Sequence, residues 1–517
     1  MNSPSSDVSV PPAPPEPQAA RALPNGLAAF LVFYASGAVL VLETAALRLV
    51  GPYVGVTLQV TSSVIGIALA AIAYGAWAGG WLADRRNPRI LLAPALVLAG
   101  IATAITLPAV RYAGEVLRGG AASAILLLVA VAVFAPAMLL SAVTPLVVKL
   151  QLADLRRTGQ VVGRLSSIGT LGAVTATLVT GFVLVAALPS TVILFGLAGS
   201  LGIVGVGLWV YLRRQDRAAL PGPARLKSAL AALGLIGAGL TVIAPNPCDV
   251  ETAYHCARVE ADAVRPGGRT LLLNSAQHSY VDLADPTHLE YAYTRWIGAV
   301  ADVIAPPGQR LDALHLGGGG FTVPRYLTAT RAGTDNLVFE IDGGLVELGE
   351  RQLGVTQGPD LRAVVGDARI LVAAEATDSR DFVVGDAFGH LVVPWHLATR
   401  EMAAEIRRVA RPGGVYVQNV IDYPPLRFIT SEVATVAAEF RHVAVIAPPE
   451  ALAGARGANF LIVASDAPLP LAAVRARLDA DNEPASLLSG GDLTDFIGAA
   501  LVLTDDYAPV DQLLATA

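Results

Sequence analysis

The chain has 517 residues, of which 54% are hydrophobic and only 15% are charged. This length favours two or more domains, and so apolar a composition calls first for a search for membrane spans. The 36 basic and 42 acidic residues give a formal net charge of −6, which leaves no basic excess and excludes nucleic acid as an expected partner.

Residues 1–24 are rich in Pro, Ser and Ala and have almost no bulky apolar residues. Such a segment cannot bury enough apolar surface to fold, so we predict a disordered tail. It has no basic region ahead of an apolar stretch, and a cleaved signal peptide is therefore not expected.

Residues 25–245 are predicted to form a multi-pass helical membrane domain. A helix needs roughly 20 apolar residues to cross the hydrocarbon core of a bilayer. Seven segments of about this length are predicted, at residues 26–46, 58–82, 90–110, 121–148, 165–187, 191–212 and 227–244. The lipid bilayer is accordingly an expected partner, and the cell membrane the expected location.

Basic residues are shared unevenly between the loops of this domain. Alternate loops carry most of them: Arg85, Arg86, Arg89, Lys149, Arg156, Arg157, Arg164, Arg213, Arg214, Arg217, Arg225 and Lys227. The other loops carry only Arg48, Arg111 and Arg118. The positive-inside rule then predicts a cytoplasmic N-terminus. The piece "GGWLADRRNPR" resembles the short loop between the second and third helices of major-facilitator transporters.

Glu43 lies within the first predicted span, where a carboxylate is costly unless it is paired or faces water. Two interpretations stay open: a proton or cation site, or a buried carboxylate paired with Arg or Lys on another helix. Arg48 is five positions further on and is a poor partner on the same helix.

After Pro245 the composition becomes that of a soluble protein. Residues 246–300 are predicted to form a small β subdomain with a linking helix, around the turn "RPGG". In residues 301–517, strand-like and helix-like segments alternate, which predicts an α/β Rossmann-like domain of the methyltransferase type, with a parallel sheet. The late segments "RHVAVIA" and "NFLIVAS" suggest a hairpin at one edge.

Glycines and acidic residues follow the predicted strands of this domain. Gly317, Gly318, Gly319 and Gly320 end the first strand, Glu340 and Asp342 the second, Asp367 follows the third, and Asp386 ends the fourth. Ligands of such sheets bind at these strand ends, so we predict a nucleoside site. No Gly-Lys-Ser/Thr follows the glycines, and the acidic residues favour a positively charged sulfonium nucleoside over a phosphate.

The soluble half resembles the spermidine synthase (aminopropyltransferase) family in its membrane-fused bacterial form. The motifs that carry this resemblance are "LLLNSAQHSYVDL", "EYAYTRWI", "LGGGG", "FEID", "GDAR", "VVGDAF", "VYVQN" and "LTDDYAPVDQLL". The resemblance implies a transferase that uses S-adenosylmethionine or decarboxylated S-adenosylmethionine as co-substrate, with no permanently bound cofactor, and a small amine or related nucleophile as acceptor.

The same resemblance implies roles for individual residues. Gln277, Gly317 to Gly319, Glu340 and Asp367 would hold the nucleoside, and Asp386 would be the general base. Tyr293 and Gln418 would line the acceptor site. Two positions depart from the family's pattern: Gly320 and Gly389 stand where soluble members have acidic residues that bind ammonium groups. These departures put both putrescine and decarboxylated S-adenosylmethionine in doubt.

The two cysteines, Cys248 and Cys256, are either one disulfide or two free thiols. Seven spans would put the soluble half outside the cell, where a disulfide is stable, whereas six would leave it in the cytoplasm. The arginine distribution favours the outside.

Other functions stay open at this stage. One is a methyltransferase on the same scaffold, and another is a non-catalytic protein that senses or transports a ligand. A homodimer is also open. His255, His278, His288, His390 and His396 have no metal-site spacing, so no metal is expected.

Overall fold

The computed structural model of the chain describes residues 22–55, 58–118, 122–152, 155–215, 237, 239–240, 243–389 and 392–514. These residues divide into two compact units, one formed within the first 244 residues and one formed mainly by Pro245–Ala517. The predicted tail, except residues 22–24, and most of the seventh predicted span, 227–244, lie outside the described residues.

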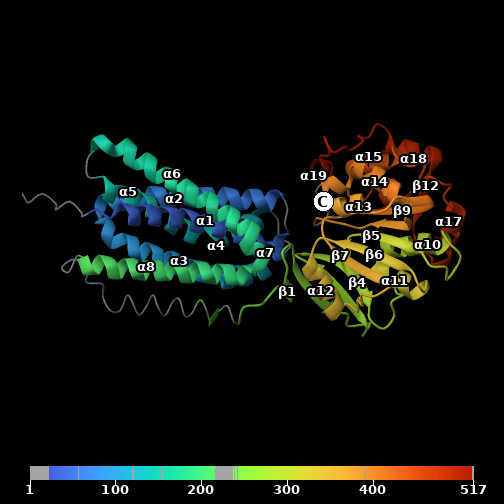
Figure 1. The fold of residues 1–517 in the computed structure, drawn as a ribbon, viewed down its shortest axis with the longest axis horizontal. Helices are drawn as coiled ribbons and strands as arrows, with labels where there is room; N and C mark the ends of the chain where they lie inside the picture. Colours follow the sequence, from blue (N-terminus) through green and yellow to red (C-terminus); the bar gives the residue numbers. More distant parts are fainter. Residues whose placement is uncertain are drawn as a thin grey trace, which may run out of the picture. The chain divides into compact units, whose positions relative to one another are not determined.

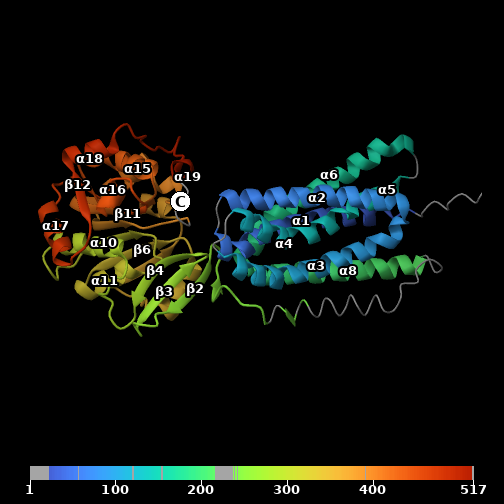
Figure 2. The same ribbon diagram turned by 180° about the vertical axis from the view of Figure 1, so that it is seen from behind.

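The first unit is built of helices that run side by side (Figures 1 and 2). They are α1 (Asn25–Val54), α2 (Leu58–Arg85), α3 (Pro88–Leu117), α4 (Ala122–Ser141), α5 (Val143–Gln151), α6 (Thr158–Val179), α7 (Val185–Ala187) and α8 (Ser190–Gln215). Within the described residues, six helical segments are long and apolar enough to cross a membrane. They coincide with the first six predicted spans.

Small residues allow these helices to approach closely. A Cβ atom on Gly75 of α2 would lie 2.2 Å from the carbonyl oxygen of Met138, and one on Gly79 would lie 2.7 Å from that of Ala142. The two glycines are four residues apart and therefore on one face of α2. Such small-residue faces are typical of helix packing in membranes.

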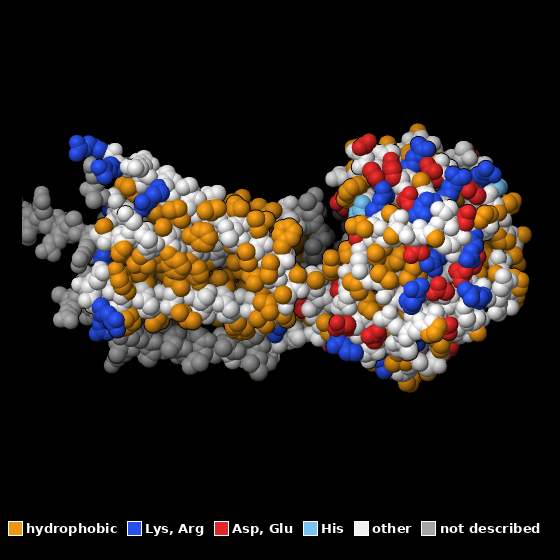
Figure 3. Space-filling view, in the orientation of Figure 1, with side chains coloured by type: hydrophobic (Ala, Val, Ile, Leu, Met, Phe, Trp, Pro, Cys, Tyr) orange, Lys and Arg blue, Asp and Glu red, His pale blue; other side chains and the backbone are white. Residues whose placement is uncertain are grey.

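The surface of the helical unit is largely apolar, with Lys and Arg near one end of the helices (Figure 3). Large apolar side chains are exposed on several helices, among them Leu69, Trp77, Phe182 and Ile203. An apolar surface of this extent suits lipid better than water. Among the described residues, Glu43 has no ion-pair partner, so the proposed pairing with Arg or Lys finds no support there.

The second unit begins with a small antiparallel sheet. Its strands lie in chain order: β1 (Val250–Glu251), β2 (Cys256–Ala261), β3 (Gly268–Leu273) and β4 (Ala276–Asp282). Leu271 and Val281 of this sheet pack against Leu345 and Leu348 of helix α12 (Gly343–Gln352). The small sheet is thereby anchored to the large one that follows.

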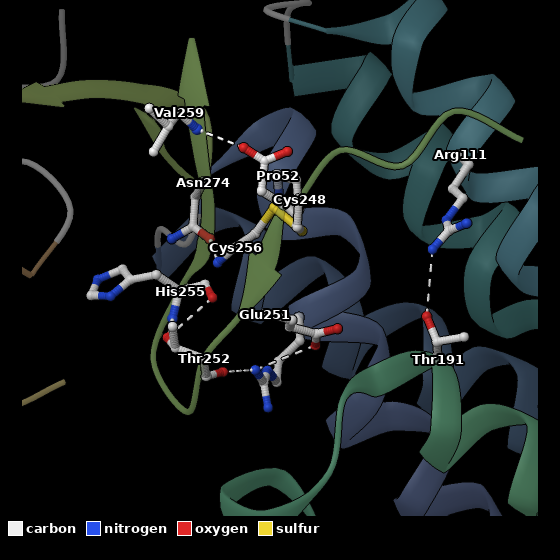
Figure 4. Close-up of a disulfide and its surroundings, with 12 residues drawn as sticks. Pro52, Arg111, Thr191, Cys248, Glu251, Thr252, His255, Cys256, Val259 and Asn274 are labelled. Atoms are coloured by element: carbon white, nitrogen blue, oxygen red, sulfur yellow. Dashed lines mark hydrogen bonds and ion pairs between the residues drawn. A yellow bond between two sulfur atoms is a disulfide. The ribbon is translucent and has the colours of Figure 1, made fainter. Parts of the chain in front are cut away.

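Cys248 and Cys256 form a disulfide at the start of the small sheet (Figure 4). The backbone N–H of Cys256 donates to Asn274 Oδ1 at 3.1 Å, next to the sulfur bridge. The alternative left open by the sequence is thus decided in favour of the bonded pair.

The large sheet has eight strands in the order β12-β10-β11-β9-β8-β5-β6-β7. Their bounds are β5 (Asp312–Leu316), β6 (Asp335–Glu340), β7 (Leu361–Val365), β8 (Arg380–Gly385), β9 (Ala410–Asp422), β10 (His442–Ala447), β11 (Ala458–Ser465) and β12 (Ser486–Ser489). Strands β5 to β9 pair in parallel, and β10, β11 and β12 join through antiparallel pairs. The predicted Rossmann-like, methyltransferase-type fold is confirmed.

Helices cover both faces of this sheet (Figures 1 and 2). One core packs the sheet against α13 (Ala368–Ala374), α14 (Arg400–Val409), α15 (Arg427–Ala437), α18 (Gly490–Ile497) and α19 (Val510–Leu513). The other packs it against α10 (Ala292–Val303), α11 (Thr322–Thr330) and α17 (Leu471–Ala480). A short helix, α16 (Pro449–Leu452), lies between β10 and β11. Successive residues of a strand point to opposite faces of the sheet, so residues that are neighbours in the sequence pack into different cores.

One local prediction differs from the structure. The late pair β10 and β11 is antiparallel as predicted, but β12 forms the edge of the sheet beyond β10.

Candidate active site

The glycine loop connects β5 to α11 and lies against the end of β8. Gly317 has a φ of +95°, and a Cβ atom there would lie 2.4 Å from the carbonyl oxygen of Asp386. Only glycine meets both conditions without strain. The loop and Asp386 are therefore held together by the backbone, because β5 and β8 are neighbours in the sheet.

Glu340 binds the glycine loop directly. Its Oε2 accepts hydrogen bonds from the backbone N–H groups of Gly318 at 2.7 Å and Gly319 at 3.2 Å, and its Oε1 accepts one from Asp342 N–H at 2.9 Å. The loop amides that could bind a phosphate are thus already bound to a carboxylate. Each carboxylate oxygen can accept further hydrogen bonds, such as those from ribose hydroxyls.

The two other predicted acids after β6 and β7 cap helices. Asp342 is only 1% exposed; it caps α12 through Gly344 N–H at 3.0 Å and also binds Thr252 and His255. Asp367 caps α13 through Arg369 N–H at 2.9 Å and stays partly exposed at the same sheet edge as Glu340. Asp367 can therefore reach a ligand, whereas the oxygens of Asp342 are engaged within the fold.

Asp386 follows β8 and faces the core that contains α10. Its Oδ1 accepts a hydrogen bond from Asn419 Nδ2 at 2.9 Å, and the Tyr293 hydroxyl also donates to it. Burial raises the pKa of Asp386 to about 6, although both hydrogen bonds act in the opposite direction. Burial, and then the Asp386 carboxylate, raise the pKa of Tyr293, so Tyr293 remains a hydroxyl donor.

A cavity of about 440 Å³ opens beside Asp386. Gln277 and Tyr293, both predicted as site residues, line it together with Asp386. A smaller recess at the glycine loop shares His278, Tyr293 and Asp386 with this cavity. Asp386 thus lies where the loop and the cavity meet, within reach of ligands in either.

Gln418 does not line this cavity, contrary to the predicted role. It is 3% exposed on the other face of β9, where its Nε2 donates to Glu432 Oε1 at 2.7 Å. Burial raises the pKa of Glu432 to about 8, so this carboxyl group is mainly protonated near neutral pH. The next residue, Asn419, points into the cavity because successive strand residues face opposite sides.

The sequence analysis missed several polar residues of the cavity as site residues, among them His278, Asn419 and Asn459. Asn459 Nδ2 donates to Asn419 Oδ1 at 2.9 Å, which extends the hydrogen bonds that start at Asp386. Strand alternation around "VYVQN" could have identified Asn419. The position of Asn459 depends on the pairing of β11 with β9, which no local motif specifies.

No protein-family model matches the sequence. The chain is 30% identical over 116 residues to the polyamine aminopropyltransferase of Vibrio vulnificus, a match that covers 22% of this chain and 38% of that protein. The chain therefore aligns with well under half the length of this curated relative.

Solved structures of similar proteins include a probable spermidine synthase from Corynebacterium glutamicum, which is 29% identical, with 51% of this chain and 96% of that chain covered and a TM-score of 0.47. Another is a spermidine synthase in complex with the transition state analogue AdoDATO, 14% identical, with 42% and 72% covered and a TM-score of 0.34. The predicted resemblance is confirmed: the chain has spermidine synthase-like homologues, which are transferases, and its C-terminal domain is aminopropyltransferase-like.

Proposed function

We propose that this chain is a membrane-bound transferase of the spermidine synthase type, which moves an alkyl group from an S-adenosylmethionine-type nucleoside to an amine. The observation that carries the proposal is the position of Asp386, between the glycine loop and the open cavity. A base is needed at that junction, because a protonated amine has no lone pair with which to attack.

The nucleoside is proposed to lie along the strand ends from Gln277 to Asp367, with the ribose at Glu340. The bond between Glu340 and the loop amides supports a cationic ligand, since the local charge at the loop is already negative. An anionic phosphate would be repelled by that carboxylate, whereas a sulfonium group would be attracted.

In the proposed reaction, the Asp386 carboxylate takes a proton from the acceptor ammonium. The nitrogen lone pair then forms a bond to the carbon attached to the sulfonium sulfur. The carbon–sulfur bond breaks, and its electron pair stays on sulfur, which leaves as a neutral thioether nucleoside. Asn419 and Tyr293 hold the carboxylate in place through the proton transfer.

The identity of the transferred group is a separate proposal. Gly320 replaces an acidic residue of the soluble family members, and a Cβ atom there would lie 2.6 Å from Ser279 Cβ. The packing of β4 therefore leaves no room for an acidic side chain that would bind an aminopropyl ammonium. Aminopropyl transfer is the leading proposal because of the relatives. Methyl transfer is the alternative, which the missing acidic side chain at Gly320 favours.

The test uses the purified full-length protein in detergent micelles with each donor nucleoside and a mixture of small amines. Aminopropyl transfer from decarboxylated S-adenosylmethionine leaves methylthioadenosine, and methyl transfer from S-adenosylmethionine leaves S-adenosylhomocysteine, so mass spectrometry separates the two. The substitution Asp386→Asn should lower turnover about a hundredfold or more, the usual contribution of a general base.

The matched control is Asp378→Asn. Asp378 precedes β8 at the opposite end of the strand and has a φ of +54°, a conformation that Asn tolerates well. This variant should keep full turnover. If Asp386→Asn is as active as Asp378→Asn, Asp386 is not the base.

A further inference from the structure

The cavity beside Asp386 is not a generally acidic site. Its lining contains two carboxylates, Asp386 and Glu483, and two guanidinium groups, Arg295 and Arg456. A diamine carries two ammonium groups at neutral pH. Once Asp386 has accepted the proton of the attacking amine, the second ammonium still needs a partner, since an uncompensated charge in a cleft costs several kcal/mol.

Glu483 is not available as that partner. It is 7% exposed at its side chain, and Arg295 binds it through Nε and also through Nη2, at 3.4 Å from Oε2. Arg295 Nη1 is held in turn by the backbone carbonyl of Leu289 at 3.2 Å and by that of Glu290. Arg295 is thus held from both sides, and its charge already balances that of Glu483.

The remaining polar groups of the cavity can donate hydrogen bonds. Asn459 donates one N–H to Asn419 and has a second N–H for a ligand. Arg456, three residues earlier in the chain, binds Glu450 through Nε at 3.0 Å, which leaves its Nη edge available. Both partners of that pair are mostly exposed, at 54% and 67%, so the pair is weak and a ligand anion can compete for Arg456.

We propose that the acceptor is an amine whose other end carries a carboxylate, an ω-amino acid rather than a diamine. The amine lies at Asp386, and the carboxylate is bound by Arg456 with help from Asn459. This inference rests on the proposed transferase function and specifies its acceptor class. It also accounts for Gly389, where an acid that would receive a second ammonium is absent.

The experiment compares two acceptors of the same carbon number, γ-aminobutyrate and putrescine, by titration calorimetry on the full-length protein in detergent. Binding is measured with and without methylthioadenosine, the nucleoside product, so the result does not depend on turnover. We expect the wild type to bind γ-aminobutyrate at least about tenfold more tightly than putrescine, a modest value for one charge-assisted hydrogen-bonded group.

Two substitutions test the assigned anion partner. Arg456→Gln keeps a polar side chain but removes the charge, and should abolish the preference for γ-aminobutyrate. Glu450→Gln removes the competing carboxylate outside the cavity, and should preserve or strengthen the preference. Opposite effects of two neighbouring substitutions are not expected from a general disturbance of the fold.

The outcomes distinguish a failure of the proposed transferase function from a failure of the proposed acceptor class. If methylthioadenosine does not bind, the nucleoside site and the proposed function fail. If it binds but putrescine is preferred, or if Arg456→Gln leaves the preference for γ-aminobutyrate unchanged, the acceptor class is wrong while the transferase proposal stands.

Discussion

Asp386 should set the acid limb of the pH dependence of activity. Its pKa of about 6 lies above the ordinary value of 3.8 because of burial, and only the ionised form can accept a proton. We therefore expect kcat/KM to be near its plateau above about pH 7 and to fall about tenfold per pH unit well below pH 6. A kcat/KM that stays constant down to about pH 5 would contradict the assignment of Asp386 as the general base.

The same shift has a consequence for stability. A carboxyl group whose pKa is raised in the folded state stabilises the fold at pH values below its ordinary pKa, and this contribution is lost as the pH rises through the folded value. At neutral pH the buried charge is thus a cost to the fold. Asp386→Asn removes this cost, so we expect the variant to be at least as stable as the wild type at neutral pH, which thermal unfolding checks.

At the residue level, the sequence was sufficient to locate the acids but not to orient every side chain. Asp386 and Glu340 could be predicted because acidic residues at the ends of parallel strands meet at one edge of the sheet. Gln418 could not, because its direction depends on which face of β9 meets α10 and which meets α15. The hydrogen bonds of Asp342 with Thr252 and His255 also join segments that are far apart in the sequence, so no local pattern predicts them.

At the level of elements, the turn from β5 into α11 depends on two separate properties of Gly317: its left-handed φ and its contact with Asp386. Gly333, in the turn between α11 and β6, has a similar φ of +80°, but a Cβ atom there would meet nothing within 4 Å. The substitution Gly333→Ala should therefore cost only the backbone strain, about 1–2 kcal/mol. Gly317→Ala should cost more and should also weaken nucleoside binding.

Thermal unfolding and calorimetry with methylthioadenosine measure the two effects in the full-length protein. Equal stability losses in the two variants, with nucleoside binding intact in Gly317→Ala, would mean that the approach of the loop to β8 is not needed for the site.

The parallel part of the sheet could be predicted from the sequence because its strands are apolar and alternate with helices, of which α12, α13 and α14 have side-chain caps at Asp342, Asp367 and Thr399. The order of the last three strands could not. The insertion of β11 between β9 and β10, and the pairing of β12 with β10, depend on long-range contacts and not on local pattern. This part of the fold supplies Asn459 and Glu483, which is why the acceptor cavity was only partly anticipated.

For the whole molecule, the side of the membrane that carries the catalytic unit decides which substrates it meets. The disulfide between Cys248 and Cys256 favours an oxidising compartment, because cytosolic thiols are kept reduced. The arginine-rich loops favour a cytoplasmic N-terminus, and together these features predict an odd number of spans. The described residues contain six candidates, so this prediction depends on the seventh expected span, 227–244, most of which lies outside the described residues.

We therefore expect the C-terminal unit to face outward. A cysteine introduced at Val264, which is 92% exposed between β2 and β3, should react with a membrane-impermeant maleimide in intact cells. A cysteine at the exposed position Arg86, between α2 and α3, should react only after permeabilisation. The reverse pattern would place the active site in the cytoplasm with an even number of spans. In the outward arrangement, the nucleoside donor of the proposed reaction would have to be supplied outside the cytoplasm.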